Sequence, residues 1–162
     1  MNEVSLRKAS LSDKITLLAL EQKVLEAERP FNSTIKMEGA HYYDLHSLLT
    51  NDKSHLIVAE LGANEHSGII GTGYIDIRRS KQSFIHEYHG YLGFMYVDSE
   101  YRGLGVNRKI MDALINWGKK QGVSDFYLDV YAENQAAVRA YEKAGFVASM
   151  VEMKLSVNSK ID

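Results

Sequence analysis

Cysteine is absent from the 162 residues of this sequence, and proline occurs only once. Disulfides, thiolate nucleophiles and cysteine-ligated metal sites are therefore excluded, because each of them requires the thiol sulfur. No proline-rich, serine-rich or repetitive segment divides the chain into parts. At this length we expect residues 1–162 to form a single domain that is large enough for a sizeable core.

A strong charge of one sign and a long apolar run are lacking as well. The formal net charge is −2, which is too weak a field to favour nucleic acid or an anionic membrane surface as a partner. No apolar run approaches the roughly 18 residues that a membrane span requires, and the first residues lack a basic and then apolar secretion signal. These absences predict a cytoplasmic protein without nucleic-acid or membrane partners.

The apolar periodicity predicts strands that alternate with helices, and hence a mixed sheet. We expect the first helix to start at a cap formed by Ser10 and Asp13. Its buried stripe is predicted at Leu11, Ile15, Leu18 and Leu25. The expected strands are residues 4–8, 55–61, 69–78, 91–97, 125–131 and 146–155, and the expected helices end near residues 28, 50, 121 and 144.

A glycine-containing loop at residues 98–108 joins an apolar strand pattern to a helical pattern. Gly103 and Gly105 carry no Cβ, so the backbone can turn tightly there and come close to a ligand. The first N–H groups of a helix have no intrahelical partner and carry partial positive charge, which suits a phosphate. Arg102 adds a cation that can pair with an oxyanion. Other phosphate loops do not match, because Arg108 occupies the last glycine of a dinucleotide fingerprint and the chain has no G-K-[ST].

The segment from Arg102 to Asn107 resembles the pyrophosphate loop Q/R-x-x-G-x-G/A of the GNAT N-acetyltransferase superfamily, with Asn107 in place of the last glycine or alanine. Residues 134–146 resemble a second motif of that superfamily, N-x-x-A-x-x-x-Y-x-x-x-G-F. The two segments occur in the order that the superfamily shows, with a helix and a strand between them. The chain is therefore similar to GNAT proteins over about a third of its length, residues 91–146.

This resemblance implies an α/β (α+β) fold, in which a mixed central sheet of about six to seven strands is flanked by about four helices. It also implies an N-acetyltransferase that moves an acetyl group from acetyl-CoA to a primary amine by direct attack. The amine would belong to a small molecule or a peptide, and no metal is expected. A non-catalytic, acyl-CoA-binding regulatory domain of the same fold is the alternative. Because many GNAT proteins pair, a homodimer is a further expectation.

The resemblance assigns the residues that would hold coenzyme A. Backbone N–H groups of the glycine loop are expected to bind the pyrophosphate, and the preceding strand to pair with the pantetheine arm. Asn134 is expected to cap the last helix and also to face this arm. The expected cofactor-binding residues are Met95, Tyr96, Val97, Arg102, Gly103, Leu104, Gly105, Val106, Asn107, Arg108 and Asn134.

For catalysis, Tyr141 is the expected general acid, because a tyrosine with a pKa of about 10 has a proton to give to the leaving thiolate. The same ring also fits the hydrophobic contact at a helix end with Phe146, and both roles can hold together. His89 is the first candidate for the base and Glu87 the second, although each could simply be a polar residue at a strand end. Phe31 is expected to line the acceptor site, and the alternative is a loop aromatic packed on its neighbours.

Overall fold

The computed structural model describes residues 3–62 and 68–158. The chain divides after Asp129 into two units. The first unit contains the sheet together with helices α1, α2 and α3, and the second contains helix α4. No helix of the described residues combines the length and the apolar character that crossing a bilayer requires.

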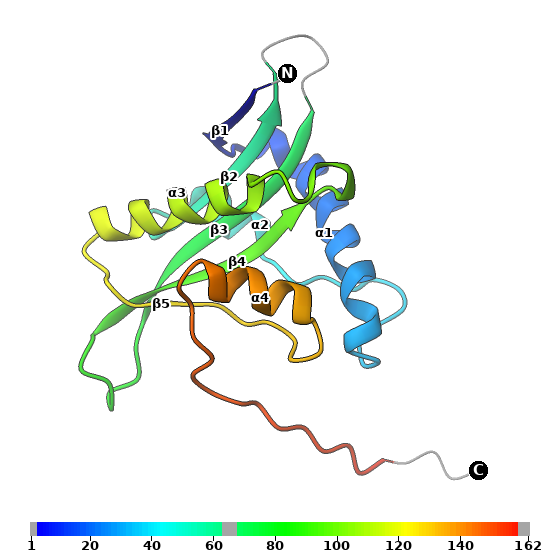
Figure 1. Ribbon diagram of the computed structural model, residues 1–162, viewed down its shortest axis with the longest axis vertical. Helices are drawn as coiled ribbons and strands as arrows, with labels where there is room; N and C mark the ends of the chain where they lie inside the picture. Colours follow the sequence, from blue (N-terminus) through cyan, green and yellow to red (C-terminus); the bar gives the residue numbers. More distant parts are fainter. Residues whose placement is uncertain (1–2, 63–67, 159–162) are drawn as a thin grey trace. The chain divides into compact units, whose positions relative to one another are not determined.

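The sheet of the first unit has the strand order β1-β2-β3-β4-β5 (Figure 1). β1 to β4 are joined by antiparallel ladders, and β5 runs parallel to β4. The sheet is therefore mixed, as the sequence predicted. The strands are β1 (Val4–Lys8), β2 (Ser54–Leu61), β3 (Ile69–Arg79), β4 (Tyr88–Val97) and β5 (Phe126–Tyr127).

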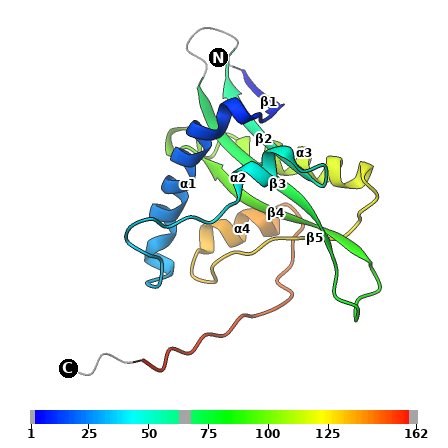
Figure 2. The same cartoon turned by 180° about the vertical axis from the view of Figure 1, so that it is seen from behind.

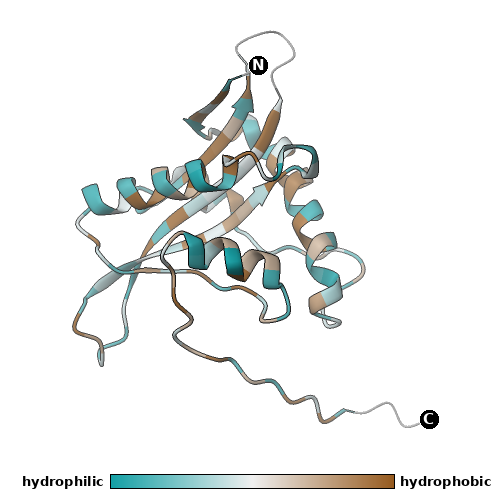
Figure 3. Ribbon diagram, in the orientation of Figure 1, coloured by the Kyte–Doolittle hydropathy of each residue, from teal (hydrophilic) through white to brown (hydrophobic). Residues whose placement is uncertain are grey.

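Helices cover both faces of this sheet. α1 (Lys14–Glu28) and α2 (Leu45–Thr50) lie on one face, and α3 (Val106–Lys120) lies on the other, as the two opposite views show (Figures 1 and 2). Apolar residues run along the strands between these layers, whereas α3 carries many hydrophilic residues (Figure 3). The core between α1, α2 and the sheet includes Leu17, Leu20, Val24, Leu45, Leu56, Val58, Tyr74 and Phe94.

The predicted stripe of α1 is right for two of its residues and wrong for the other two. Leu25 is buried and Leu18 packs against the core, whereas Leu11 and Ile15 are 53% and 83% exposed. The buried face of α1 includes an acidic residue, Glu21. Because this position is not apolar, the apolar periodicity of the sequence does not identify the face correctly. This carboxylate is fully buried and accepts hydrogen bonds from the backbone N–H groups of Tyr42 and Tyr43, at 3.0 and 2.9 Å. α1 thereby fixes the segment that leads into α2. The buried residues of α1 are Leu17, Leu20, Glu21, Val24 and Leu25.

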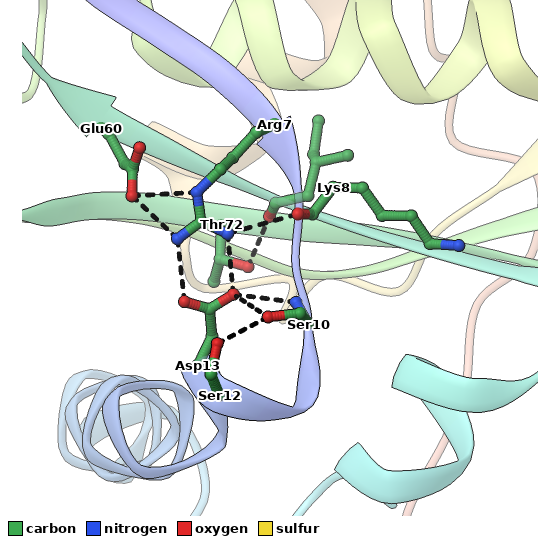
Figure 4. Close-up of polar contacts among 8 residues, drawn as sticks. Arg7, Lys8, Ser10, Ser12, Asp13, Glu60 and Thr72 are labelled. Atoms are coloured by element: carbon green, nitrogen blue, oxygen red, sulfur yellow. Dashed lines mark hydrogen bonds and ion pairs between the residues drawn. The ribbon is translucent and has the colours of Figure 1, made fainter. Parts of the chain in front are cut away.

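The predicted cap at the start of the first helix is confirmed, and it belongs to a larger ionic cluster (Figure 4). Asp13 accepts the backbone N–H of Ser10 at 2.8 Å and two guanidinium N–H groups of Arg7, each at 2.8 Å. Arg7 also donates to Glu60 on β2, at 2.8 and 3.0 Å. The cluster therefore ties β1, β2 and the start of α1 together. Hydrogen bonding from the Arg7 guanidinium lowers the pKa of Asp13 below its usual value.

The last two helices end as predicted. Beyond α3, Gly122 has a positive φ of 92°, and the N–H of Val123 donates to the carbonyl of Gly118 at 3.1 Å. α4 (Gln135–Lys143) is capped by Asn134, whose side chain accepts the N–H of Ala137 at 3.3 Å. Gly145, two residues beyond the end of the helix, has a positive φ of 102°, and the Tyr141 and Phe146 rings meet edge to face with their centroids 6.1 Å apart.

The sheet of the described chain has five strands, so the prediction of six to seven was too high. The strand predicted over residues 125–131 is limited to Phe126–Tyr127, and the one predicted over residues 146–155 is absent, because residues 144–158 contain no helix or strand. The second helix also begins three residues later than the predicted residue 42, at Leu45. Alternation shows which side chains are apolar, but a strand also requires a partner for its backbone, which alternation cannot show.

Candidate active site

The glycine loop lies between the end of β4 and the start of α3, as the sequence predicted. Gly103 and Gly105 have φ angles of 76° and 80°, in the left-handed region that side chains with a Cβ rarely adopt. α3 begins at Val106, directly after Gly105. The N–H groups of its first turn have no acceptor within the helix, and the helix dipole adds partial positive charge there. This arrangement fits an anionic group such as a diphosphate.

Side chains around the loop hold it against the rest of the first unit. The Nε of Arg102 donates to the carbonyl of Val97 at 3.0 Å, which ties the loop back to the end of β4. Asp98 accepts the Nζ of Lys23 on α1 at 3.0 Å and the hydroxyl of Tyr96 at 3.2 Å. The loop is therefore held in place from two elements before a ligand arrives, which reduces the entropy lost on binding.

β4 and β5 separate before β4 reaches this loop. In the described residues their ladder contains only the pairs Gly90–Phe126 and Tyr91–Tyr127. From Leu92 onward, the edge of β4 that faces β5 therefore has no strand partner in that ladder. Such an edge offers N–H and C=O groups to an extended ligand. The three residues expected to pair with pantetheine, Met95, Tyr96 and Val97, lie in this stretch.

A β-bulge interrupts β4 between the point of separation and the loop. Phe94 has a φ of 53°, and the β3–β4 register shifts between Thr72 and Tyr74. The Phe94 ring is 2% exposed and stacks on Tyr43, with the centroids 4.4 Å apart. Bulges and strained backbone are frequent beside active sites, where they redirect a strand. Here the bulge turns Phe94 into the core on the α1 side.

A tyrosine–aspartate pair bridges β4 and the segment after β5 at the point of separation. The hydroxyl of Tyr91 donates to Asp129 at 2.8 Å, and the guanidinium carbon of Arg78 lies 3.8 Å from the centroid of the Tyr91 ring. Arg78 is in turn held by Asp76, at 3.1 Å. Burial and the nearby carboxylate raise the pKa of Tyr91, so its hydroxyl keeps its proton at neutral pH. A protonated hydroxyl beside a carboxylate can hold a primary ammonium group.

His89, the first candidate base, is half-buried on β4 and contacts the hydroxyl of Ser80 through its Nδ1, at 2.9 Å. Burial lowers the pKa of His89, and the neighbouring His86 and Arg78 lower it further. The imidazole is therefore neutral at pH 7 and able to accept a proton. Glu87, the second candidate, has a side chain that is 68% exposed and lies 3.7 Å from Arg79.

Sequence reasoning missed the residues that hold these groups. Tyr91 was assigned only to an apolar strand, Asp129 only to a strand, and the loop around Ser80 and His86 was read as merely polar. The one available signal was the alternation of polar side chains along the strands, which places Tyr91 two residues from His89 on the same face of β4.

Three predicted site residues lie elsewhere in the chain. Phe31 is half-buried in the 3₁₀ turn Arg29–Phe31 that follows α1. Tyr141 and Asn134 belong to the second unit, on α4 and at its cap. Their functional roles therefore stay predictions. Among the residues that the structure describes, no group of three His, Cys, Asp or Glu side chains could hold a metal ion.

Comparison with known proteins places this arrangement in one family. A model described as the acetyltransferase (GNAT) family matches residues 21–146, which is more than half of the chain. The chain therefore belongs to the GNAT acetyltransferase family. The resemblance inferred from the glycine loop and from the segment at residues 134–146 is thus confirmed.

Curated relatives match over a shorter region. N-alpha-acetyltransferase 30 of Saccharomyces cerevisiae is 34% identical over 58 residues, which are 36% of this chain and 33% of the yeast protein. The [ribosomal protein bS18]-alanine N-acetyltransferase of Escherichia coli is 40% identical over 50 residues, which are 31% of this chain and 34% of that enzyme. The matched region thus spans about a third of the length of these relatives.

Solved structures share the fold over nearly the whole chain. The tetramutant BH1408 protein of Bacillus halodurans has a TM-score of 0.80 at 24% identity, with coverage of 94% of this chain and 99% of that one. A predicted acetyltransferase of Clostridium acetobutylicum, solved with acetyl-CoA, has a TM-score of 0.73 at 21% identity, with coverage of 96% and 97%. These likenesses confirm the GNAT fold that the sequence predicted.

Proposed function

We propose that this chain is an N-acetyltransferase that transfers an acetyl group from acetyl-CoA to a primary amine. One observation carries the proposal: the glycine loop at the start of α3 is continuous with the edge of β4 that, among the described residues, has no β5 partner from Leu92 onward. A ligand with a diphosphate at one end and an extended amide-containing arm fits both features. Coenzyme A is such a ligand, and membership of the GNAT family supports its choice.

The glycine loop can provide enough hydrogen bonds to bind coenzyme A with micromolar affinity. A hydrogen bond to a charged group contributes about 1.5–3 kcal/mol. A dissociation constant of about 1 μM corresponds to about 8 kcal/mol of net binding free energy. Four or five such bonds from residues 103–108, together with pairing of the arm along β4, reach this range after the cost of ordering the ligand.

The acceptor amine is proposed to bind at the Tyr91–Asp129 pair. A lysine-like ammonium has a pKa of about 10.4, so losing its proton at pH 7 costs roughly 4–5 kcal/mol. His89 lies on the same face of β4 two residues away, and a strand rises about 3.3 Å per residue. We propose that water carries the proton from the amine to His89. Glu87 remains the second candidate for this role.

The neutral amine then attacks the acetyl carbonyl directly. The new C–N bond forms as the C–S bond breaks, and the departing thiolate takes a proton. We assign this proton to the hydroxyl of Tyr141 on α4, and the second proton that the nitrogen loses as the amide forms returns to Tyr141 through solvent. No covalent acyl-enzyme is required, and the chain has no cysteine to form one.

A thiol-release assay tests the proposal. The protein is incubated with acetyl-CoA and one amine at a time, from a panel containing a peptide N-terminus, a polyamine, an aminoglycoside and an amino acid. The peptide is included because the curated relatives are named for N-alpha-acetylation and for acetylation of a ribosomal-protein alanine. Thiol release above the background without amine supports an acetyltransferase.

Two other outcomes would redirect the assignment. Binding of coenzyme A without thiol release from any amine would favour the non-catalytic acyl-CoA-binding domain, and an absence of binding would contradict both functions. We also propose a cytoplasmic location and a homodimer, as expected from the sequence. Cell fractionation and light scattering would test these two points.

A further inference from the structure

Four polar side chains near one end of the sheet form a continuous hydrogen-bonded chain. The Oγ of Ser80, which directly follows β3, lies 2.6 Å from Nδ1 of His86 and 2.9 Å from Nδ1 of His89. The Nε2 of His86 lies 3.0 Å from the hydroxyl of Tyr127 on β5. The chain therefore connects β4, the β3–β4 connection and β5, with His89 at one end and Tyr127 at the other.

Backbone and ring contacts hold this chain in place. The N–H of Ser80 donates to the carbonyl of Glu87 at 2.7 Å, which closes the β3–β4 hairpin around it. The rings of His89 and Tyr127 meet edge to face with centroids 5.0 Å apart, and the two imidazoles have centroids 6.1 Å apart. The side chains thus come from separate segments, but the fold brings them to one place.

The single hydroxyl hydrogen of Ser80 couples the tautomers of the two histidines. A serine hydroxyl donates one hydrogen bond and otherwise accepts. For both contacts to be hydrogen bonds, Ser80 donates to one imidazole while the other donates its Nδ1–H to the serine oxygen. When His89 is the donor, its Nε2 is left as an acceptor, and His86 donates from Nε2 to Tyr127. The opposite order reverses every bond in the chain.

We propose that Ser80, His86 and Tyr127 form a proton relay that takes the amine's proton from His89 and passes it to solvent. The inference rests on the proposed function, and it adds three residues that neither the sequence motifs nor the family match assigns. Their contact is with His89, so they act on the reaction through it as positioning and relay groups.

In each proton transfer of the relay, every group that gains a proton passes another one on. A proton binds Nε2 of His89 while the proton on its Nδ1 moves to the Ser80 oxygen. The hydroxyl proton of Ser80 moves to Nδ1 of His86, and the Nε2 proton of His86 moves to the Tyr127 oxygen. The original hydroxyl proton of Tyr127, a half-buried residue, leaves to water. One proton has then crossed the chain, and every bond in it has reversed. The next turnover requires both imidazoles to return to their starting tautomers by exchanging N–H protons with water, together with rotation of the Ser80 and Tyr127 hydroxyls.

The charges around His89 favour a pair that takes up one proton rather than two. His89 is faced by Asp76 and Arg78 from β3, by His86 from the hairpin connection and by Asp125 beside β5. Two imidazolium rings would repel each other, and both would have to donate to the same serine oxygen. Protonation of one ring therefore disfavours protonation of the other, so the shared Ser80 contact couples the two sites.

Nitrogen NMR of the full chain tests the coupling without requiring activity. With ¹⁵N-labelled histidine, we expect the ring-nitrogen resonances of His86 to respond to the protonation of His89, because the Ser80 hydroxyl connects the two rings. Ser80→Ala should remove the coupling, so that the two residues titrate independently. Ser83→Ala, in the same exposed connection, is the matched control and should leave the wild-type curves unchanged. Independent titration in the wild-type protein would overturn the proposal.

Kinetics test the catalytic role. Ser80→Ala and Tyr127→Phe should each lower kcat about tenfold or more and change its pH profile, while the KM for acetyl-CoA stays constant. Ser80→Thr, which keeps the hydroxyl, should restore most of the rate, and Tyr88→Phe on β4 should be neutral. An active wild-type enzyme whose rate survives Ser80→Ala would overturn the relay alone. A wild-type protein inactive with every amine would overturn the proposed function instead.

Discussion

At the residue scale, the site depends on side chains that hold one another in position before any ligand binds. Tyr91 is fixed by Asp129 and by the guanidinium of Arg78, and Arg78 is fixed by Asp76. Asp76 also accepts the hydroxyl of Ser54 on β2, at 2.8 Å. Groups supported in this way lose little conformational entropy when substrate arrives, which is a condition for efficient catalysis.

Tyr91→Phe should lower kcat/KM for the amine by about 10–100-fold. The variant keeps the ring but removes a hydrogen bond to a charged group, which is worth about 1.5–3 kcal/mol. The KM for acetyl-CoA should not change, because the glycine loop is untouched. Thiol-release kinetics measure both constants, and Tyr88→Phe serves as the control on the same strand. An unchanged kcat/KM would remove Tyr91 from the acceptor site.

Asp13→Asn should reduce the free energy of unfolding by about 1–3 kcal/mol at pH 7, because the guanidinium of Arg7 loses the charged acceptor that the buried Asp13 side chain provides. Urea titration measures the change. Asp52→Asn, at an exposed position in the turn before β2, is the control and should have little effect.

The same ion pair predicts how stability depends on pH. Because the pKa of Asp13 is lowered in the folded protein, its contribution is complete above the unfolded value of about 3.9. The contribution is lost as the pH falls from there through the folded pKa. The stability difference between wild type and Asp13→Asn should therefore be constant near neutral pH and shrink in acid. A difference that grows below pH 4 would contradict this account.

The sequence could indicate some site residues and not others. Gly103 and Gly105 were predictable, because a tight turn before a helix is a local feature. Tyr91 and Asp129 lie 38 residues apart, and they meet only because β4 and β5 pair in one particular register. Local patterns do not contain that register, so the pair could not be foreseen.

At the scale of elements, β4 organises the site. Its first part pairs with β5, its middle carries the bulge at Phe94, and its last part has no β5 partner in the described residues before the glycine loop. In the proposed function, this one strand would supply a position for the amine, a pairing edge for the pantetheine arm and a connection to the glycine loop. These three functions have a fixed order along the strand.

Gly105→Ala should weaken coenzyme A binding at least tenfold. A Cβ at a φ of 80° costs about 1 kcal/mol or more, and relief of this strain moves the N–H groups at the start of α3. Gly39→Ala is the matched control, since Gly39 also has a positive φ, of 67°, and open space around it. It should lose similar stability and keep its affinity in calorimetry. Equal loss of affinity in both variants would contradict a specific role for the loop.

Phe94→Ala should destabilise the protein by about 3–5 kcal/mol, because the ring is buried and stacked on Tyr43. Chemical denaturation measures this. If the free energy of unfolding fell by less than about 1 kcal/mol, the bulge and not the Phe94 ring would determine the packing around residue 94.

A helix could be predicted from the sequence where its apolar residues recur with the helical period and are also the residues that are buried. The buried face of α3 followed the helical period, and the cap residues of α3 and α4 marked their ends. α1 was misassigned because the buried Glu21 interrupts its apolar stripe, and its role in holding residues 42–43 appears only in three dimensions.

At the scale of the whole molecule, two short motifs were enough to predict the fold class, but they did not predict the size of the sheet. Motifs depend on local backbone chemistry, whereas the number of strands depends on which segments find a partner. A ligand that binds the folded chain should stabilise all of it by mass action. Acetyl-CoA at 100 times its dissociation constant should add about 2.7 kcal/mol, visible as a raised Tm. A Tm independent of ligand concentration would argue against binding.

The most direct test of the central claim is isothermal titration calorimetry with coenzyme A, because the account requires the glycine loop to bind its diphosphate. It predicts one site per chain with a dissociation constant near 1 μM, weaker binding in Gly105→Ala, and competition by the nucleotide half of the cofactor. The absence of heat with the wild-type protein, or equal affinity in Gly105→Ala, would contradict it.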